Sequence, residues 1–209
     1  MIGIKKLYLV RHGQTLWNLE GRTQGSKDSE LTSLGLRQAE MLGNGLRKTR
    51  FDAIYSSPLK RALLTAEVIS KMQNIEYTLD DRLVEMNFGE WEGLTTLEIE
   101  KSYSDNFRIW REEPHNAIIP KGESIEIAQR RMIEFVNECI MASSDENILV
   151  VSHSTTIRLF LLHILSMDLR HYYKLKQDNC AINLIEFRNH GPVLRKYNDT
   201  CHMDIITEG

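Results

Sequence analysis

The feature that most constrains the fold is the run Leu9-Val10-Arg11-His12-Gly13-Gln14-Thr15-Leu16-Trp17-Asn18, close to the N-terminus. Residues 5–10 are mostly apolar and β-favouring, which predicts a buried strand that ends at Arg11 and His12. In an open α/β sheet, ligands bind at the carboxyl ends of the strands. The guanidinium of Arg11 suits phosphate oxygens, and Gly13 lets the backbone turn sharply beside a bound group. A lone histidine at such a position is more often structural, so its neighbours carry the argument.

A second histidine follows a second strand. Residues 147–152 form the clearest apolar run in the chain, typical of a parallel strand covered on both faces. His153 comes next, and residues 154–162 read as a helix that begins at once. The free N–H groups of a helix N-terminus beside an imidazole make a ready phosphate site. Because both strands should run parallel, His12 and His153 can stand side by side.

Two further segments contain candidate functional residues. Residues 51–56 predict a strand, Ser57-Pro58 ends it, and Arg61 then lies in the first turn of a helix. A cation is unfavourable at that end of the helix dipole, so Arg61 is either a solvated surface residue or is held for an anion. Residues 80–93 carry two glycines and several carboxylates, which favours a structured functional loop over a helix. Spacing alone does not choose among Glu85, Glu90 and Glu92.

The remaining elements frame these segments. The glycine-rich residues 20–30 are a loop that forms either a pocket wall or a plain connection. A helix opens after Leu31, with Thr32 or Ser33 as its N-cap. Residues 94–120 predict one or two short helices that cap the pocket. Residues 75–79 predict a strand, residues 125–140 an amphipathic helix, and residues 179–187 and 193–197 a final hairpin.

Composition excludes several classes. At 209 residues the chain suits one domain, and a net charge of −3 argues against general nucleic-acid binding. Three cysteines without Cys-x-x-Cys spacing indicate neither a disulfide framework nor a zinc site. The N-terminus lacks a signal-peptide pattern, and the apolar stretch 159–165 is too short to span a bilayer. We therefore expect a cytoplasmic protein that makes no contact with membranes.

The run Arg11-His12-Gly13-Gln14-Thr15 resembles the Arg-His-Gly-Glu-Thr signature of the histidine phosphatase superfamily, the phosphoglycerate-mutase-like proteins, with Gln14 in place of Glu. Residues 56–66, 83–93 and 122–124 resemble further blocks of that family in the same order. The resemblance implies an α/β three-layer α/β/α sandwich with a mostly parallel mixed sheet. It also implies a single domain over residues 1–209, with a small helical cap at about 94–120.

The resemblance also implies roles for individual residues. His12 would be the nucleophile that accepts a phosphoryl group, and Glu85 the general acid and base. Arg11, Arg61 and His153 would bind and stabilise the phosphoryl oxygens. Second-tier phosphate contacts would come from three further residues, Asn18, Gln24 and the backbone of Ser154. Where the family usually has two glycines after the second histidine, this chain has Ser154 and Thr155, whose side chains narrow or polarise the pocket wall.

The implied activity is hydrolysis of a small phosphorylated metabolite through a phosphohistidine, without a metal or other cofactor. The short form is similar to α-ribazole phosphatases and broad-specificity phosphatases, and the short 94–120 segment favours a phosphatase over a mutase. A cofactor-dependent phosphoglycerate mutase and a non-catalytic phosphate-binding regulatory module stay open as alternatives. A metal hydrolase is disfavoured because no local ligand pair such as His-x-x-x-His occurs. A homodimer also stays open.

Overall fold

The structure is a computed structural model that describes residues 4–206. Its core is a six-stranded sheet in the order β3-β2-β4-β1-β5-β6. The first four strands of that order run parallel, β5 runs antiparallel to β1, and β6 runs antiparallel to β5. The strands are β1 (Lys5–Arg11), β2 (Ala53–Ser56), β3 (Tyr77–Leu79), β4 (Asn147–Ser152), β5 (Ile182–Arg188) and β6 (Gly191–Asp199).

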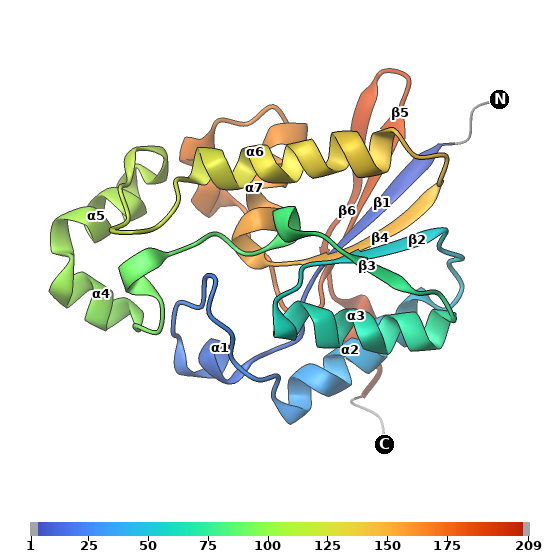
Figure 1. Ribbon diagram of the computed structural model, residues 1–209, viewed down its shortest axis with the longest axis horizontal. Coiled ribbons are helices and arrows are strands. Elements are labelled where there is room, and N and C mark those ends of the chain that lie inside the picture. The colour runs from blue at the N-terminus through green and yellow to red at the C-terminus, as the bar shows by residue number, and fades with distance from the viewer. Residues whose placement is uncertain (1–3, 207–209) are drawn as a thin grey trace.

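Helices cover both faces of the sheet. Figure 1 shows α2 and α3 on one face, α6 and α7 on the other, and α4 and α5 beyond one end of the sheet. The α-helices are α1 (Leu16–Glu20), α2 (Ser33–Leu46), α3 (Lys60–Gln73), α4 (Thr96–Ser102), α5 (Ser104–Glu112), α6 (Ile125–Phe135) and α7 (Ser154–Ile164). A π-helical segment, Val136–Met141, continues α6. Short 3-10 helices span Asp81–Leu83, Gly89–Trp91, Pro114–Asn116, Leu169–Lys174 and Cys201–Ile206.

The central strand β4 explains why the molecule has two cores. Successive side chains of a strand point to opposite faces, so a strand covered on both faces must be apolar throughout. Ile148 and Val150 pack with residues of α6 and α7, whereas Leu149 and Val151 pack with residues of α2 and α3. All four side chains are fully buried. The apolar run of β4 therefore fixes a layer of helices on each side of the sheet.

A third apolar cluster fastens the cap. Trp91, Ile99 of α4 and Trp110 of α5 pack against residues of α6 and α7, including Ile125 and Leu159. The rings of Trp91 and Trp110 meet edge to face with their centroids 6.2 Å apart. The cap is thus held to the sandwich by an aromatic core of its own.

The predicted fold class is confirmed, with small differences at the ends of elements. Thr32 is the N-cap of α2 and accepts a hydrogen bond from the amide of Gly35. The strand predicted at 75–79 begins only at Tyr77, because α3 ends at Asn74 in a left-handed conformation and two linking residues follow. The short helix α1 was not predicted. It begins with a capping box between Thr15 and Asn18.

Candidate active site

The two strand-end histidines lie side by side, as predicted. Strands β1 and β4 are hydrogen-bonded neighbours, with Arg11 opposite Ser152, so each strand delivers its next residue to the same edge. The imidazole rings of His12 and His153 have centroids 5.2 Å apart and are tilted by 55°. Both side chains are buried.

The tautomer of His12 follows from the hydrogen bond at its imidazole Nδ1. Its Nδ1 lies 2.7 Å from the carbonyl oxygen of Gly13, which can only accept, so Nδ1 carries the proton and Nε2 keeps its lone pair. Burial lowers the pKa of His12 well below its usual range, and the charges of Arg61 and Arg11 lower it further. The imidazole is therefore neutral at neutral pH, with a free nitrogen able to act as a nucleophile.

Close backbone contact fixes the turn after His12. A Cβ on Gly13 would lie 2.4 Å from the carbonyl oxygen of Gly35 in α2, so only glycine fits there. The amide of Gly13 donates to the hydroxyl of Thr65 in α3 over 3.0 Å. The turn is thus locked between two helices.

His153 sits deeper in the protein. Its Nε2 lies 2.8 Å from the hydroxyl oxygen of Ser57, and the amide of Leu59 donates to the same oxygen. The pKa of His153 is lowered well below its usual range, chiefly by burial and next by the charge of Arg61. Its Nδ1 is buried without a hydrogen-bond partner among the described residues, which leaves this atom available to a bound group.

Two arginines flank the histidine pair, and each uses terminal guanidinium nitrogens in hydrogen bonds to the protein while its Nε has no partner among the described residues. Arg11 donates from Nη1 to the carbonyl oxygen of Gln177 over 2.7 Å. Arg61, which is 1% exposed, donates to the carbonyl oxygens of Gly25 and Lys27 and forms an ion pair with Asp28. In both arginines Nε is buried without a partner in the described structure. Arg61 is therefore no solvated surface residue, and it also anchors the loop after α1.

Glu85 is the carboxylate that borders the same cavity as His12. Its Oε1 accepts the amides of Met86 (2.9 Å) and Thr156 (3.1 Å) and the Thr156 hydroxyl (3.3 Å). Its Oε2 accepts the amide of Thr155 over 3.1 Å. The N-terminus of α7 thus holds the carboxyl in place by its free N–H groups. Since Oε1 accepts two backbone amides and Oε2 only one, Oε2 is the oxygen with more room for a proton.

The other two carboxylates of this segment lie elsewhere. Glu92 is buried and accepts hydrogen bonds from the amide and hydroxyl of Ser26 and from the amide of Phe88. Glu90 pairs with Lys121 at the surface. The structure therefore separates Glu85, at the cavity, from one carboxylate that holds a loop and one that lies in an ion pair.

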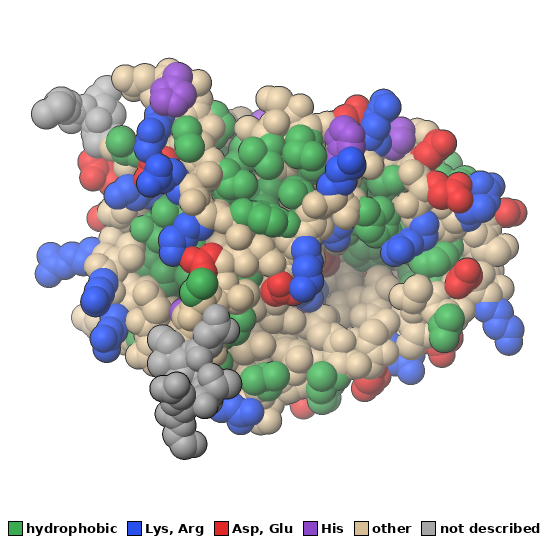
Figure 2. Space-filling model, turned by 180° about the vertical axis from the view of Figure 1, so that it is seen from behind, with side chains coloured by type: hydrophobic (Ala, Val, Ile, Leu, Met, Phe, Trp, Pro, Cys, Tyr) green, Lys and Arg blue, Asp and Glu red, His purple; other side chains and the backbone are tan. Residues whose placement is uncertain are grey.

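Arg11, His12, Arg61 and Glu85 border one cavity of about 260 Å³ beneath the cap. His153 contacts the His12 ring but is not among the residues that line this cavity. Figure 2 shows the surface from behind, hollowed between the cap and the loop that follows α1. Residues from both ends of the chain meet here: Arg11, His12, Asn18, Arg22, Thr23, Gln24, Gly25, Arg61, Glu85, Phe88, Trp110, Tyr172 and Tyr173. The loop 20–30 is thus a pocket wall rather than a plain connection.

Comparison with known proteins decides the family. A model described as histidine phosphatase superfamily (branch 1) matches residues 7–200. The chain belongs to this superfamily. It is a phosphatase of the histidine phosphatase type, and the predicted resemblance is confirmed.

Relatives of this histidine phosphatase are similar over nearly its whole length. Phosphoserine phosphatase 1 of Hydrogenobacter thermophilus is 36% identical, covering 95% of this chain and 94% of the relative. The solved structure of Bacillus stearothermophilus YhfR has a TM-score of 0.91 and 32% identity, covering 95% and 99%. A mutant phosphoserine phosphatase of Entamoeba histolytica in complex with phosphoserine has a TM-score of 0.84 and 35% identity, covering 95% and 99%.

The predicted site residues of the histidine phosphatase all line the cavity except His153 and Ser154. The Asn18 side chain lines the cavity, and its Oδ1 accepts from Asn179. Gln24 lines the cavity too, and its Oε1 is buried without a partner in the described part of the chain. Ser154 does not line the cavity; it is the first residue of α7, beside His153. The Thr155 side chain, which was expected to narrow or polarise the pocket wall, does not line the cavity either; its hydroxyl lies 3.1 Å from that of Tyr172, a residue of the cavity wall.

Sequence reasoning missed the aromatic wall. Tyr172 and Tyr173 come from the 3-10 helix after α7, a segment without hydrophobic periodicity. The guanidinium of Arg158 lies over the Tyr172 ring at 3.7 Å and donates to the Tyr172 carbonyl oxygen. The adjacent tyrosines were the only local signal. Arg22 and Thr23 of the cavity wall were read only as part of a polar loop.

Two features are absent from residues 4–206, the part of the chain that the structure describes. None of the helices is long and apolar enough to cross a membrane. In the same part of the chain, no three or more His, Cys, Asp or Glu side chains gather in a way that could hold a metal ion.

Proposed function

We propose that this phosphatase hydrolyses small phosphomonoesters through a phosphohistidine on His12, with phosphoserine as the first substrate to test. The observation that carries the proposal is the His12 imidazole, whose Nδ1 lies against the Gly13 carbonyl oxygen and whose Nε2 is free in a cavity shared with two arginines and Glu85. A phosphoryl group needs a nucleophile in line with the leaving oxygen and positive charge around its other oxygens. The cavity brings together groups suited to both tasks.

In the first step Nε2 of His12 attacks phosphorus, an N–P bond forms and the ester P–O bond breaks. Glu85 gives the proton on Oε2 to the departing alkoxide, which leaves as an alcohol. The Nε–H groups of Arg11 and Arg61, which have no partner among the described residues, support binding of the phosphoryl oxygens. His153 can add a donor if Ser57 donates to its Nε2, because the ring proton then lies on Nδ1.

In the second step Glu85, now ionised, takes a proton from water as the water oxygen attacks phosphorus. The N–P bond breaks, inorganic phosphate leaves, and His12 and Glu85 return to their starting states. The same carboxyl serves both steps, which requires that it stay within reach of both the ester oxygen and the attacking water. Asn18 and Gln24, which line the cavity, complete the proposed phosphate site, whereas Ser154 does not line it.

Phosphoserine is proposed because relatives of this chain include phosphoserine phosphatases. The cavity volume of about 260 Å³ is consistent with a small ester. Beyond the phosphoryl site, the aromatic wall of Phe88, Trp110, Tyr172 and Tyr173 would face the alcohol part of the substrate.

The test is hydrolysis of phosphoserine and of 4-nitrophenyl phosphate, with EDTA present, by the wild type and by His12→Ala. We expect turnover that chelation does not change, and a loss of at least ~1000-fold in the variant, because the nucleophile is gone. Circular dichroism and thermal unfolding must show the variant folded. Labelled substrate should transfer its phosphoryl group to the wild type and not to His12→Ala.

Other results would redirect the proposal. If both esters are inert and 3-phosphoglycerate is isomerised in the presence of 2,3-bisphosphoglycerate, the protein is a mutase. If every assay fails while phosphate or a phosphomonoester still binds, the protein is a binding module. Turnover that EDTA abolishes would contradict the phosphohistidine mechanism.

A further inference from the structure

The segment that carries Glu85 is irregular, so its backbone groups depend on side chains for hydrogen bonds. It lies between the 3-10 helices Asp81–Leu83 and Gly89–Trp91 and pairs with no strand. Buried backbone polar groups that lack partners are costly, and a loop in this position cannot supply its own. The hydrogen bonds of this segment therefore identify what holds Glu85 in place.

Arg131 of α6 supplies the bonds on the N-terminal side of Glu85. Its Nη1 donates to the carbonyl oxygens of Arg82 (2.7 Å) and Val84 (2.6 Å). The hydroxyl of Thr156 also donates to the Val84 oxygen. One guanidinium nitrogen thus donates hydrogen bonds to two carbonyl oxygens within three residues of Glu85.

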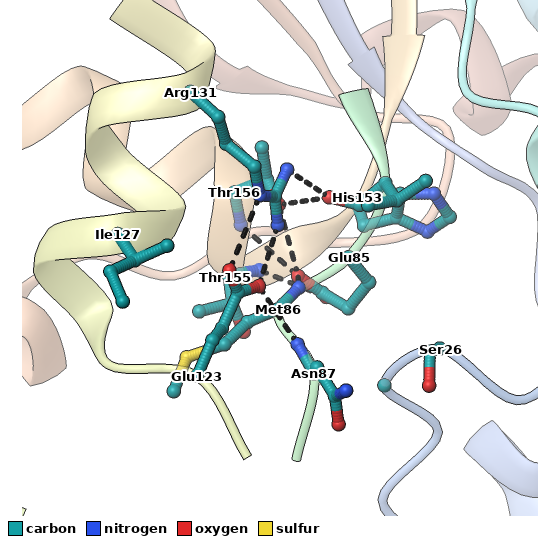
Figure 3. A network of polar contacts seen from close by, with 12 residues as sticks. Ser26, Glu85, Met86, Asn87, Glu123, Ile127, Arg131, His153, Thr155 and Thr156 are labelled. Atoms are coloured by element: carbon teal, nitrogen blue, oxygen red, sulfur yellow. Dashed lines mark hydrogen bonds and ion pairs between the residues drawn. The ribbon is translucent and has the colours of Figure 1, made fainter. Parts of the chain in front are cut away.

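Glu123 supplies the bonds on the C-terminal side. Its Oε1 accepts the amide of Asn87 over 2.9 Å, and its own amide donates to the Asn87 carbonyl oxygen over 2.9 Å. The same Oε1 forms an ion pair with Nη2 of Arg131 at 2.9 Å. Figure 3 shows Arg131 and Glu123 side by side, with Glu85 and Thr156 next to them.

The ion pair is set apart from ordinary surface pairs by its burial and geometry. The side chains of Arg131 and Glu123 are 15% and 17% exposed, whereas the matched neighbour Arg130 on α6 is exposed. A guanidinium presents several donors in a rigid plane, so it can hold a carboxylate and two carbonyls at once. The single nitrogen of a lysine cannot reproduce this geometry.

We infer that the Arg131–Glu123 pair is a positioning device for the general acid, which clamps the backbone on both sides of Glu85 and so sets where its carboxyl lies. Neither residue lines the cavity, so the pair acts through Glu85 and not on the substrate. The inference rests on the proposed function, in which Glu85 gives a proton to the leaving oxygen. A displacement of about 1 Å at a reacting group can cost on the order of 100-fold in rate.

The leaving group separates a positioning role from a merely structural one. An alkoxide such as that of phosphoserine needs a proton as it departs, whereas 4-nitrophenolate is stable without one. Misplacing the acid therefore lowers kcat/KM for the alkyl ester much more than for the aryl ester. Damage to the phosphate site or partial unfolding lowers both values together.

The experiment measures kcat/KM for phosphoserine and 4-nitrophenyl phosphate in the wild type, Arg131→Lys, Glu123→Gln, Glu85→Gln and Arg130→Lys, with thermal unfolding of each. Glu85→Gln calibrates the full loss of the acid. In Arg131→Lys, kcat/KM is expected to fall roughly 10- to 100-fold for phosphoserine and at most about 3-fold for the aryl ester. The larger loss is a part of the roughly 10²- to 10⁴-fold rate enhancement that a general acid supplies. Glu123→Gln, which removes the charge but keeps an oxygen for Asn87, should show a smaller selective loss. Arg130→Lys should match the wild type.

The outcomes distinguish the inference from the proposed function. Equal losses on the two esters in folded Arg131→Lys and Glu123→Gln, or no loss in either, would overturn the positioning role. If Arg131→Lys does not fold, the result for Glu123→Gln decides. A Glu85→Gln variant that loses both esters equally, or a wild type inert to both, would instead refute the role of Glu85 in the proposed function, and the positioning role would fall with it.

Discussion

Glu92 lies in the same loop as the proposed general acid, yet its surroundings predict a purely structural contribution. The side chain is 8% exposed. Its Oε1 accepts the Ser26 amide at 2.7 Å and the Phe88 amide at 3.1 Å, and both oxygens accept the Ser26 hydroxyl. These bonds join the loop that forms one wall of the cavity to the segment that leads into the cap. We predict that Glu92→Gln and Glu92→Ala weaken this junction to different degrees.

The magnitudes follow from the hydrogen bonds that each variant keeps. Glu92→Gln retains an oxygen for the two amides but loses the charge. A bond to a charged group contributes about 1 kcal/mol more than a neutral one, so two bonds give a loss of about 2 kcal/mol in the free energy of unfolding. Glu92→Ala leaves the buried Phe88 amide without an acceptor and removes the bonds to Ser26. Together these raise the predicted loss to about 4 kcal/mol.

Urea unfolding with linear extrapolation measures both losses, and steady-state kinetics on an aryl phosphate accompanies it. A loosened cavity wall should raise KM more than it lowers kcat, since Glu92 touches no reacting group. Glu90→Gln is the matched control, because Glu90 pairs at the surface with Lys121 and its loss should leave stability nearly unchanged. The reasoning fails if Glu92→Ala is no less stable than Glu90→Gln, or if kcat falls as it does in Glu85→Gln.

Two further predictions test the site's electrostatics and its tight turn. His12 and His153 have folded-state pKa values well below the usual 6.5, chiefly because they are buried, so the unfolded chain binds protons that the folded chain refuses. As the pH falls below 6.5, the free energy of unfolding should therefore decrease by about 1.4 kcal/mol per pH unit for each histidine, until the pH reaches the pKa values of the folded state. Urea unfolding measured at several pH values from 7 to about 5 should show that the free energy of unfolding depends less on pH in a variant with both histidines changed to Asn. Gly13→Ala would place a Cβ 2.4 Å from a backbone oxygen of α2, and it should lower the free energy of unfolding by about 3 kcal/mol or prevent folding. The control Gly21→Ala, at a position with φ of 66° and open space around it, should lower the free energy of unfolding by about 1 kcal/mol. Equal losses in the two variants would contradict the predicted clash.

The parts of the site predicted from sequence are those encoded locally. An apolar run followed by a histidine places that histidine at a strand end whatever the rest of the chain does, so His12 and His153 could be located before their strands were seen to be neighbours. The family resemblance then selected Glu85 from three carboxylates that spacing left equivalent. The structure supports that selection, because only Glu85 of the three lines the cavity.

The parts that were missed depend on contacts between distant residues. The bond between Ser26 and Glu92 joins positions 66 apart, and that between Arg131 and Val84 joins positions 47 apart. In the sequence, Arg130 and Arg131 are adjacent and alike. Only the rotation of α6 against the Glu85 segment buries one of them and leaves the other in solvent. No local periodicity records which arginine meets the two carbonyls, so the positioning residue could not be recognised before the fold was known.

Arg61 shows why a residue's type can indicate a site without revealing how the site is built. Its position at a helix N-terminus suggested an anion, yet both terminal nitrogens of its guanidinium bind the loop through Gly25, Lys27 and Asp28. Only Nε is buried and unpaired. If Arg61 contacts phosphate as proposed, the same planar group holds the cavity wall and the substrate, so moving the loop would turn the guanidinium. The order of that loop and the affinity for phosphate are then coupled through one side chain, and Glu92, which fastens the loop at Ser26, contributes to binding without touching the ligand.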